Sequence, residues 1–208
     1  MSVIDIISQD LDWREREIAA MRILLSGPSL TDSQRAALLR AGWAMLYAHY
    51  EGFIKNALTI FYDEAAKATE KCEYLPSNTK IFALKDALRS LRNLPSADML
   101  NKIEKFKTEH LESNHEFPDV DTKSNLRPDI LIALLKTADL NTSIAEKNEV
   151  KLRTLVSRRN SIAHGEKSFI NEISYFRGFE DAVYEVLYDV ALQIDYRLSQ
   201  PPYLAQQG

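Results

Sequence analysis

The stretch that decides the fold is LLRAGWAMLYAHYEGFIKNALTIFY, residues 38–62. Its only charged residues are Arg40, Glu51 and Lys55, so a helix over this stretch is apolar nearly all round. Such a helix is usually central to a bundle, because each of its sides needs a neighbour that covers it. The capping residues of SLTDSQ (29–34) stand just before it and predict where the longer helix begins.

The rest of the chain reads as further helices. Six glycines and seven prolines in 208 residues leave long patterns of helical periodicity, and no stretch alternates with the period of two that a strand needs. We therefore predict an all-α protein, a helical bundle with a four-helix core and additional peripheral helices. The predicted helices cover about 3–25, 33–70, 79–93, 97–113, 128–138, 140–163 and 170–199.

The middle of the chain differs in composition from its two ends. Residues 72–127 are more polar, and SNHEFPDVDTKSNLRP (113–128) contains two prolines and reads as a loop. We predict a single domain over residues 1–208, with 72–127 as a helical and loop insert and 200–208 as a tail.

Composition narrows the class of protein. The chain is 45% hydrophobic and 27% charged, as ordinary globular proteins are. It has no apolar run of membrane-spanning length, and acids stand where a secretory signal would carry its positive charges, so we expect a cytoplasmic protein without a membrane partner. The single Cys72 excludes an internal disulfide and fits a reducing compartment. The net charge of −4 excludes a protein built globally to coat nucleic acid, so a polyanion site must be local.

One charged side chain occupies a position that the helical pattern assigns to the core. In KLRTLVSRRNSIAHGE (151–166), a turn of about 100° per residue places Arg159 within about 20° of Leu152, at the centre of the apolar face. Arg158 falls toward solvent. A guanidinium does not lose its charge, so burying it is costly unless it meets a carboxylate or another anion.

The residues around Arg159 indicate chemistry on a phosphate. His164 would move protons to or from a 2′-hydroxyl or a leaving oxygen, while Arg159 neutralises charge on the phosphate. An internal 2′-hydroxyl nucleophile makes RNA a better substrate than DNA. Asn160 shares a side of the helix with His164 and would fix the tautomer of the imidazole, and Gly165 predicts that the helix ends there. No acid interrupts the segment from Lys151 to Gly165, and the residues expected to bind RNA in this positive patch are Lys151, Arg153 and Arg158.

Structural alternatives account for the same residues. A buried ion pair with Glu51 would equally account for the inward position of Arg159. Glu51 would then either hold Arg159 in place for catalysis or have a purely structural role that joins two helices. His164, next to a glycine, would then be a capping imidazole. Glu112 and His115 have the Glu-x-x-His spacing of di-iron sites, but no second pair accompanies them. We therefore expect a solvated helix end there, no metal and no cofactor.

Two blocks of sequence resemble one known superfamily. RNSIAHGE (159–166) resembles the HEPN signature, an arginine followed by four to six residues and a histidine. Upstream, YAHYEGFIK (47–55) resembles the RiboL-PSP-HEPN branch, also described as the MAE-like HEPN group. The resemblance is strongest over 36–62 and 150–167, looser over the last helix, and does not extend to the insert at 72–127.

The resemblance implies an all-α HEPN fold, usually a homodimer in which the motifs of both copies meet in a cleft. It implies a metal-independent endoribonuclease, a toxin or phage-defence effector, with RNA as its substrate and an antitoxin or defence-system protein as a partner. By motif position Arg159 and His164 carry over as the catalytic pair and Asn160 as the supporting polar residue, with Arg158 as the alternative arginine. Some HEPN proteins are not nucleases, so a non-catalytic module that binds RNA, a nucleotide or a partner protein stays the second hypothesis.

One position departs from a toxin branch of this superfamily. In that branch a tyrosine stands two residues after the histidine and is modified by a nucleotidyltransferase antitoxin. Here the position is Glu166, so we do not expect that route of inactivation.

Overall fold

The computed structural model describes residues 2–167 and 173–204, and within these ranges all regular secondary structure is helical. The predicted all-α class is therefore confirmed. No helix in this part of the chain combines the length and the apolar character needed to cross a membrane.

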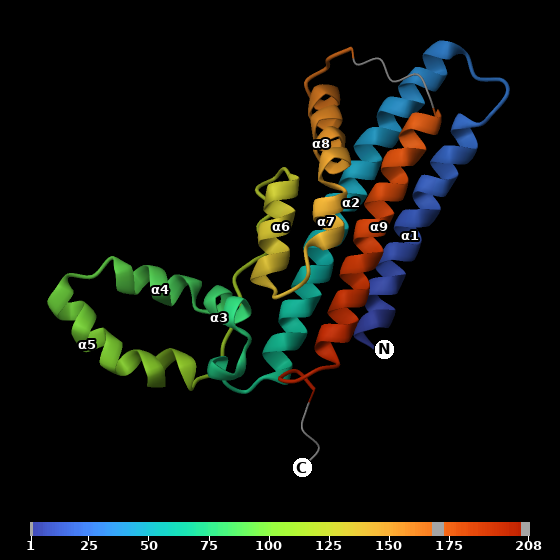
Figure 1. Cartoon of the computed structure of the whole chain (residues 1–208). Coiled ribbons are helices and arrows are strands. Elements are labelled where there is room, and N and C mark those ends of the chain that lie inside the picture. The colour runs from blue at the N-terminus through green and yellow to red at the C-terminus, as the bar shows by residue number, and fades with distance from the viewer. Residues whose placement is uncertain (1, 168–172, 205–208) are drawn as a thin grey trace.

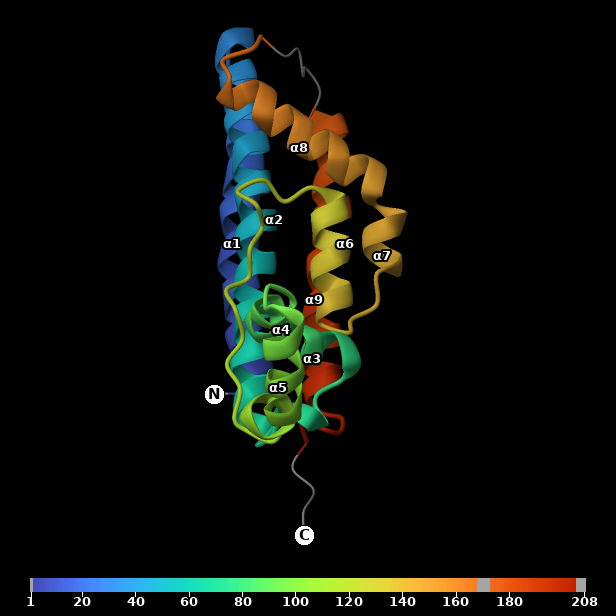
Figure 2. The ribbon, with the colours of Figure 1, turned by 90° about the vertical axis from the view of Figure 1, so that its left-hand side faces the viewer.

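Four helices form the bundle. Three long ones, α1 (Val3–Leu25), α2 (Asp32–Ala68) and α9 (Ile173–Leu198), run side by side along the molecule (Figure 1). The fourth, α8 (Glu149–Ala163), crosses the bundle obliquely (Figure 2) and contacts both α2 and α9. The shorter helices α6 (Pro128–Thr137) and α7 (Ser143–Lys147) pack beside α8.

Helix α2 is central, as its sequence predicts. Thr31 caps its first turn: the Gln34 backbone N–H donates to the Thr31 hydroxyl, and the Gln34 side-chain oxygen accepts from the Thr31 backbone N–H. Trp43, Tyr50 and Phe53 on its inner sides are fully buried. One side of α2 nevertheless stays uncovered in the single chain. It carries alanines at helical spacing, here named the alanine stripe: Ala37, Ala41, Ala44 and Ala48, of which Ala44 is half-buried and the others exposed.

The predicted insert contains short helices that leave the bundle. It comprises a 3₁₀ turn at Cys72–Tyr74, α3 (Ser77–Ala83), α4 (Lys85–Arg92), α5 (Ser96–Phe106) and a π-helical turn at Lys107–Leu111. Helices α4 and α5, which have no buried residue, are here called the arm and project from the bundle (Figure 1). From the arm, the chain returns along α2 to the start of α6 (Figure 2).

Two helices that the periodicity predicts as continuous are broken. The predicted helix over 140–163 divides at Asn148, which is buried and whose side-chain N–H groups donate to the Ile144 carbonyl and to Glu185. This bonding holds Asn148 as the turn between α7 and α8. The predicted helix over 79–93 likewise divides at Leu84, which is buried and turns the chain into the arm.

The last residues are partly packed. Tyr203 is buried against Phe61, and the Arg197 guanidinium lies 5.4 Å from the centroid of its ring. Leu204 is exposed. The rest of the predicted tail, 205–208, and the predicted start of the last helix at 170–172 lie outside the described residues.

Candidate functional site

The HEPN-like segment forms the C-terminal half of α8 and the turn that ends it. The Glu166 N–H donates to the Ser161 carbonyl and the Gly165 N–H donates to the Ile162 carbonyl, the pair of bonds known as a Schellman motif. Gly165 has a φ of +74°, a conformation that glycine adopts without strain. The predicted helix end at Gly165 is therefore confirmed, and it places His164, which is exposed, at the C-cap.

Arg159 points inward from α8 toward α2. Its guanidinium Cζ lies 4.2 Å from the centroid of the Tyr47 ring, and its Nη1 donates to the Asn160 side-chain oxygen at 2.9 Å. A longer contact of 3.8 Å joins its Nη2 to a Glu51 carboxylate oxygen. The Arg159 side chain is 28% exposed, so the guanidinium is held by the fold and still accessible from solvent.

Tyr47 provides a fixed support for Arg159. Its ring is buried, its hydroxyl accepts from the Leu126 N–H at 2.7 Å, and the same hydroxyl donates to the Asn125 side chain at 3.4 Å. Burial raises the pKa of Tyr47 to about 12, so the phenol keeps its proton at neutral pH. The second carboxylate oxygen of Glu51, Oε1, is buried and has no hydrogen-bond partner within the described residues. The carboxylate can therefore accept a further donor.

Two depressions flank the end of α8. One, of about 250 Å³, contains Arg159, Tyr47 and Glu51 together with alanines of the stripe. The other, of about 620 Å³, contains Asn160 and His164. The His164 N–H donates to the Asn160 carbonyl, so α8 stays regular up to this residue and does not swing the imidazole toward Arg159. Within one chain, Arg159 and His164 thus lie on different sides of α8.

Asn160 makes a different contact from the one we expect from spacing. Its side-chain oxygen is engaged by Arg159, and no hydrogen bond joins it to the His164 ring within the parts of the chain that the structure describes. Asn160 therefore orients the guanidinium and leaves the imidazole tautomer undetermined.

The residues predicted to bind RNA do not share one surface. Arg153 lines the depression of His164 and forms an ion pair with Glu149. At about 100° per residue, Lys151 and Arg158 lie together on another side of α8. Lys151 is exposed, whereas Arg158 is half-buried, less open to solvent than its position predicts.

Three further residues of the site were not among the sequence candidates. Arg40 of α2 donates to the Glu166 carbonyl at 2.7 Å and so ties the turn after α8 to the bundle. Asn125 and Arg127, from the segment before α6, line the depression that contains His164. Loop residues give no periodic signal, so the sequence alone does not place them here.

Glu112 and His115 are separated by their own contacts. Glu112 pairs with Lys107 at 3.1 Å, and the His115 ring packs edge-on against Phe117 with centroids 5.2 Å apart. Across residues 2–167 and 173–204, no group of three or more His, Cys, Asp and Glu side chains is placed to hold a metal ion.

Comparison with known proteins identifies the family. Neither the curated proteins nor the solved structures contain a match to this chain. The family model for MAE_28990-like HEPN proteins matches residues 4–203, which include α2, α8, Arg159 and His164. The chain belongs to this MAE-like HEPN family.

Proposed function

We propose that the protein is a metal-independent endoribonuclease whose site is completed by a second copy of the chain. The observation that carries the proposal is an accessible guanidinium, Arg159, held on a buried aromatic ring at the same end of α8 as an exposed histidine, His164. Permanent positive charge and a titratable imidazole are what cleavage of RNA through its own 2′-hydroxyl needs.

In this reaction each residue has a definite part. His164 accepts the proton of the 2′-hydroxyl as the 2′-oxygen attacks phosphorus, and the 5′-oxygen leaves with a proton from a second imidazole or from water. Arg159 binds the phosphate oxygens as negative charge develops on them. The products are a 2′,3′-cyclic phosphate and a 5′-hydroxyl. Tyr47, Asn160 and Glu51 position Arg159 and do not touch the substrate.

A second copy supplies what one chain lacks. Arg159 and His164 lie on different sides of α8, so one phosphate is served better by residues from two chains than from one. A two-fold axis beside the end of α8 would bring both pairs into one cleft. The alanine stripe borders the depression of Arg159, and its small side chains would let the backbone of a second copy approach closely. We assign the dimer interface to this side of α2.

The test is cleavage of RNA in EDTA by the wild type and by two variants. His164→Ala and Arg159→Ala should each lower the cleavage rate by about 10²- to 10⁴-fold, while leaving far-UV circular dichroism unchanged. Products of the wild type should end in cyclic phosphate. A folded wild-type dimer that leaves tRNA, mRNA and structured RNA intact would overturn the proposal for the free protein. A toxin or phage-defence role in the cytoplasm, with an antitoxin or defence partner, belongs to the same proposal.

One observation favours the second candidate, a non-catalytic HEPN module. A catalytic imidazole is usually oriented by a hydrogen bond to its second nitrogen. Within the described residues, no side chain makes such a bond to His164. A binding module needs the basic residues and not the imidazole. If His164→Ala kept full biological activity and joint charge reversal of Arg158 and Arg159 abolished it, binding without catalysis would be the function.

A further inference from the structure

The arm carries positive charge that the rest of its surroundings does not neutralise. Helix α4 presents Lys85, Arg89 and Arg92 at spacings of four and three residues, which places them within about 60° of one another around the helix axis. All three side chains are exposed, and none forms an ion pair within the described parts of the chain. We call them the basic stripe.

Two of the three lysines that follow the stripe behave differently, whereas the third, Lys105, is exposed and forms no ion pair within the described residues. Lys102 pairs with Glu109 at 2.8 Å and Lys107 pairs with Glu112 at 3.1 Å, so their charges are already balanced. The single acid of α4, Asp86, lies about 100° round the helix from Lys85. The basic stripe is therefore a concentrated and unpaired positive surface on a protein whose net charge is −4.

The side of α4 next to the stripe is held toward the protein, because Leu88 and Leu91 lie about 60° and 120° round the helix from Lys85. Leu88 and Leu91 are half-buried, and Leu88 packs against the hydrophobic core. Lys85, Arg89 and Arg92 nevertheless stay exposed, so the basic stripe faces solvent beside the leucine side of α4. The stripe is therefore presented by the fold of the arm.

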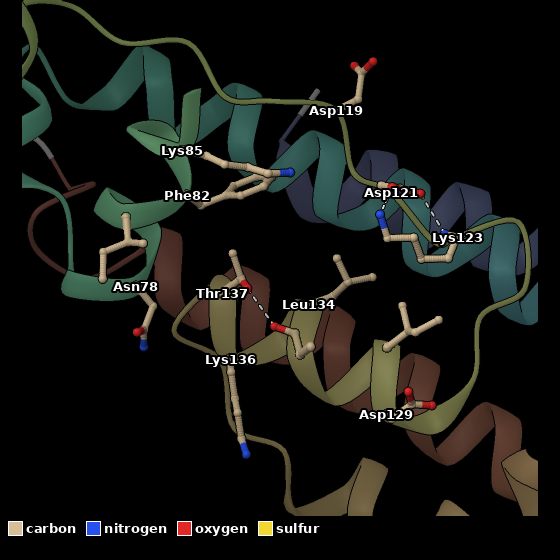
Figure 3. A pocket seen from close by; sticks show the side chains of 13 residues that line it. Asn78, Phe82, Lys85, Asp119, Asp121, Lys123, Asp129, Leu134, Lys136 and Thr137 are labelled. Carbon is tan, nitrogen blue, oxygen red and sulfur yellow. Dashed lines mark hydrogen bonds and ion pairs between the residues drawn. The ribbon is translucent and has the colours of Figure 1, made fainter. Parts of the chain in front are cut away.

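A continuous surface joins the stripe to the candidate cleavage site. Lys85 stands at the edge of a groove of about 550 Å³ between α3, α6 and the segment at 119–123, with Lys123 and Asp129 farther along it (Figure 3). Asp129 also lines the depression that contains Arg127 and His164. The groove and the depression therefore adjoin at Asp129.

Charge along this path is balanced in the middle and positive at the arm. Lys123 pairs with Asp121, and Arg127 pairs with Asp129 at 3.0 Å. The groove floor is apolar, formed by Phe82, Ile130 and Leu134 among others. A strand that leaves the cleavage site would meet little net charge until it reached the basic stripe.

We propose that the basic stripe of the arm is a second RNA-binding surface, which holds the phosphates of the same strand that is cut at His164. The inference rests on the proposed function, since that function places RNA in the depression of His164, at the end of the path away from the arm. RNA is the occupant that the charges favour, because three unpaired cations on one helical side match consecutive phosphates and release the counterions condensed on them. The arm would thus make long RNA a better substrate than short RNA.

The experiment compares two triple variants with equal loss of charge. The stripe variant is Lys85→Gln, Arg89→Gln and Arg92→Gln. The control matches the loss of formal charge and is Arg16→Gln, Lys67→Gln and Lys147→Gln, three exposed basic residues away from the path, each of which pairs with an acid. Both are made in a His164→Ala background, so that binding of a long unstructured RNA is measured by fluorescence anisotropy without cleavage, at several salt concentrations.

We expect the stripe variant to bind RNA at least about tenfold more weakly at low salt, with the slope of log K against log salt reduced by about 2, since each contact with a single strand contributes about 0.7. The control should bind nearly as the parent does. With His164 restored, the stripe variant should cleave a dinucleotide as fast as the wild type and long RNA more slowly.

The two proposals fail separately. Equal binding by the stripe and control variants would overturn the arm surface, even if RNA is cleaved. Tighter binding of polyglutamate than of RNA would also overturn it, in favour of an acidic protein partner. RNA binding that depends on the stripe, in a wild type that cleaves neither the dinucleotide nor long RNA, would overturn the nuclease and leave the arm surface standing.

Discussion

The guanidinium of Arg159 lies over the ring of Tyr47, with Cζ 4.2 Å from the ring centroid. The negative face of an aromatic ring attracts a cation, and this ring is immobile because it is buried and its hydroxyl accepts from the Leu126 N–H. The carboxylate of Glu51 lies farther away, at 3.8 Å. The Tyr47 ring, which supports Arg159 more closely than Glu51 does, does not neutralise the guanidinium. The charge of Arg159 therefore stays available to a phosphate.

Substitution of Tyr47 separates the ring from its hydroxyl. Tyr47→Phe keeps the ring under Arg159 but leaves the buried Leu126 N–H without an acceptor, which should lower the free energy of unfolding by about 1–3 kcal/mol. RNA cleavage should stay within a few-fold of the wild type. Tyr47→Leu removes the ring and should reduce cleavage by tenfold or more. Urea unfolding and initial cleavage rates measure the two effects. Equal loss of cleavage in both variants would show that the hydroxyl matters and the ring does not.

A double-mutant cycle measures the tie between Arg159 and Glu51. The contact is 3.8 Å long and both side chains are partly exposed, at 28% and 19%, so the coupling free energy should be below about 1 kcal/mol. The variants are Arg159→Met, Glu51→Gln and the combination, compared by urea unfolding. Coupling of several kcal/mol, without any effect of Arg159→Met on RNA, would instead support a purely structural pair.

Local periodicity was sufficient for the long helices of the bundle and for the inward position of Arg159. It predicts α2, the end of α8 at Gly165 and a guanidinium on the buried side, because each depends on residues within a few turns of one helix. It does not predict the break at Asn148, whose side chain donates one hydrogen bond to the Ile144 carbonyl and one to Glu185, 37 positions away.

The surroundings of Arg159 depend on contacts that no local pattern records. The hydroxyl of Tyr47 is bonded by Asn125 and Leu126, which are 78 and 79 residues away in sequence. Spacing also pairs Asn160 with His164, whereas the nearer guanidinium of Arg159 takes its oxygen. The apolar pattern of 38–62 predicts neighbours on all sides of α2, whereas the structure leaves the alanine stripe uncovered in the single chain.

Substitution of Gly165 tests whether the turn after α8 needs its left-handed conformation. Gly165→Ala meets no neighbouring atom within 4 Å, so its cost comes from the backbone alone, at a φ of +74°. We expect a loss of about 1–2 kcal/mol in the free energy of unfolding and slower RNA cleavage, because the neighbouring His164 shifts. Gly178→Ala is the matched control. It also has open space, lies within α9, and should stabilise the fold by about 0.4–1 kcal/mol. Unchanged stability in Gly165→Ala would mean that the turn rearranges without cost.

His49 should make stability depend on pH. It is buried on the other side of α2, with Nδ1 3.5 Å from an Arg14 nitrogen and Nε2 2.9 Å from a Glu17 oxygen, and with Asp10 bonded to Arg14. Burial lowers the pKa of His49 below its ordinary 6.5, with the Arg14 charge acting in the same direction. The unfolded chain then binds the proton more readily than the folded one. Stability is therefore full above pH 6.5 and is lost as pH falls through the interval below it.

The measurement is urea unfolding of the wild type and of His49→Gln at about pH 7.5 and pH 5.5. The wild type should lose more stability between these values than the variant does. The variant should keep some pH dependence, because burial also lowers the pKa of His115. His164→Gln removes an exposed histidine and is the control for the substitution itself. A slope as steep in His49→Gln as in the wild type would assign the pH dependence to other groups.

A substitution on the alanine stripe tests the proposed dimer interface without changing the residues of the candidate site. Ala41 is exposed on the stripe and does not line the depression of Arg159, so Ala41→Glu should place two like charges in a close interface and leave the site of each chain unaltered. Ala68→Glu makes the same change at an exposed position at the end of α2, on a different side of the helix. Light scattering should show a dimer for the wild type and for Ala68→Glu, and a folded monomer for Ala41→Glu. Cleavage should fall with the dimer fraction, because Arg159 and His164 of one chain face apart. A wild type that is monomeric at every concentration and still cleaves RNA would show that one chain brings the two side chains together by itself.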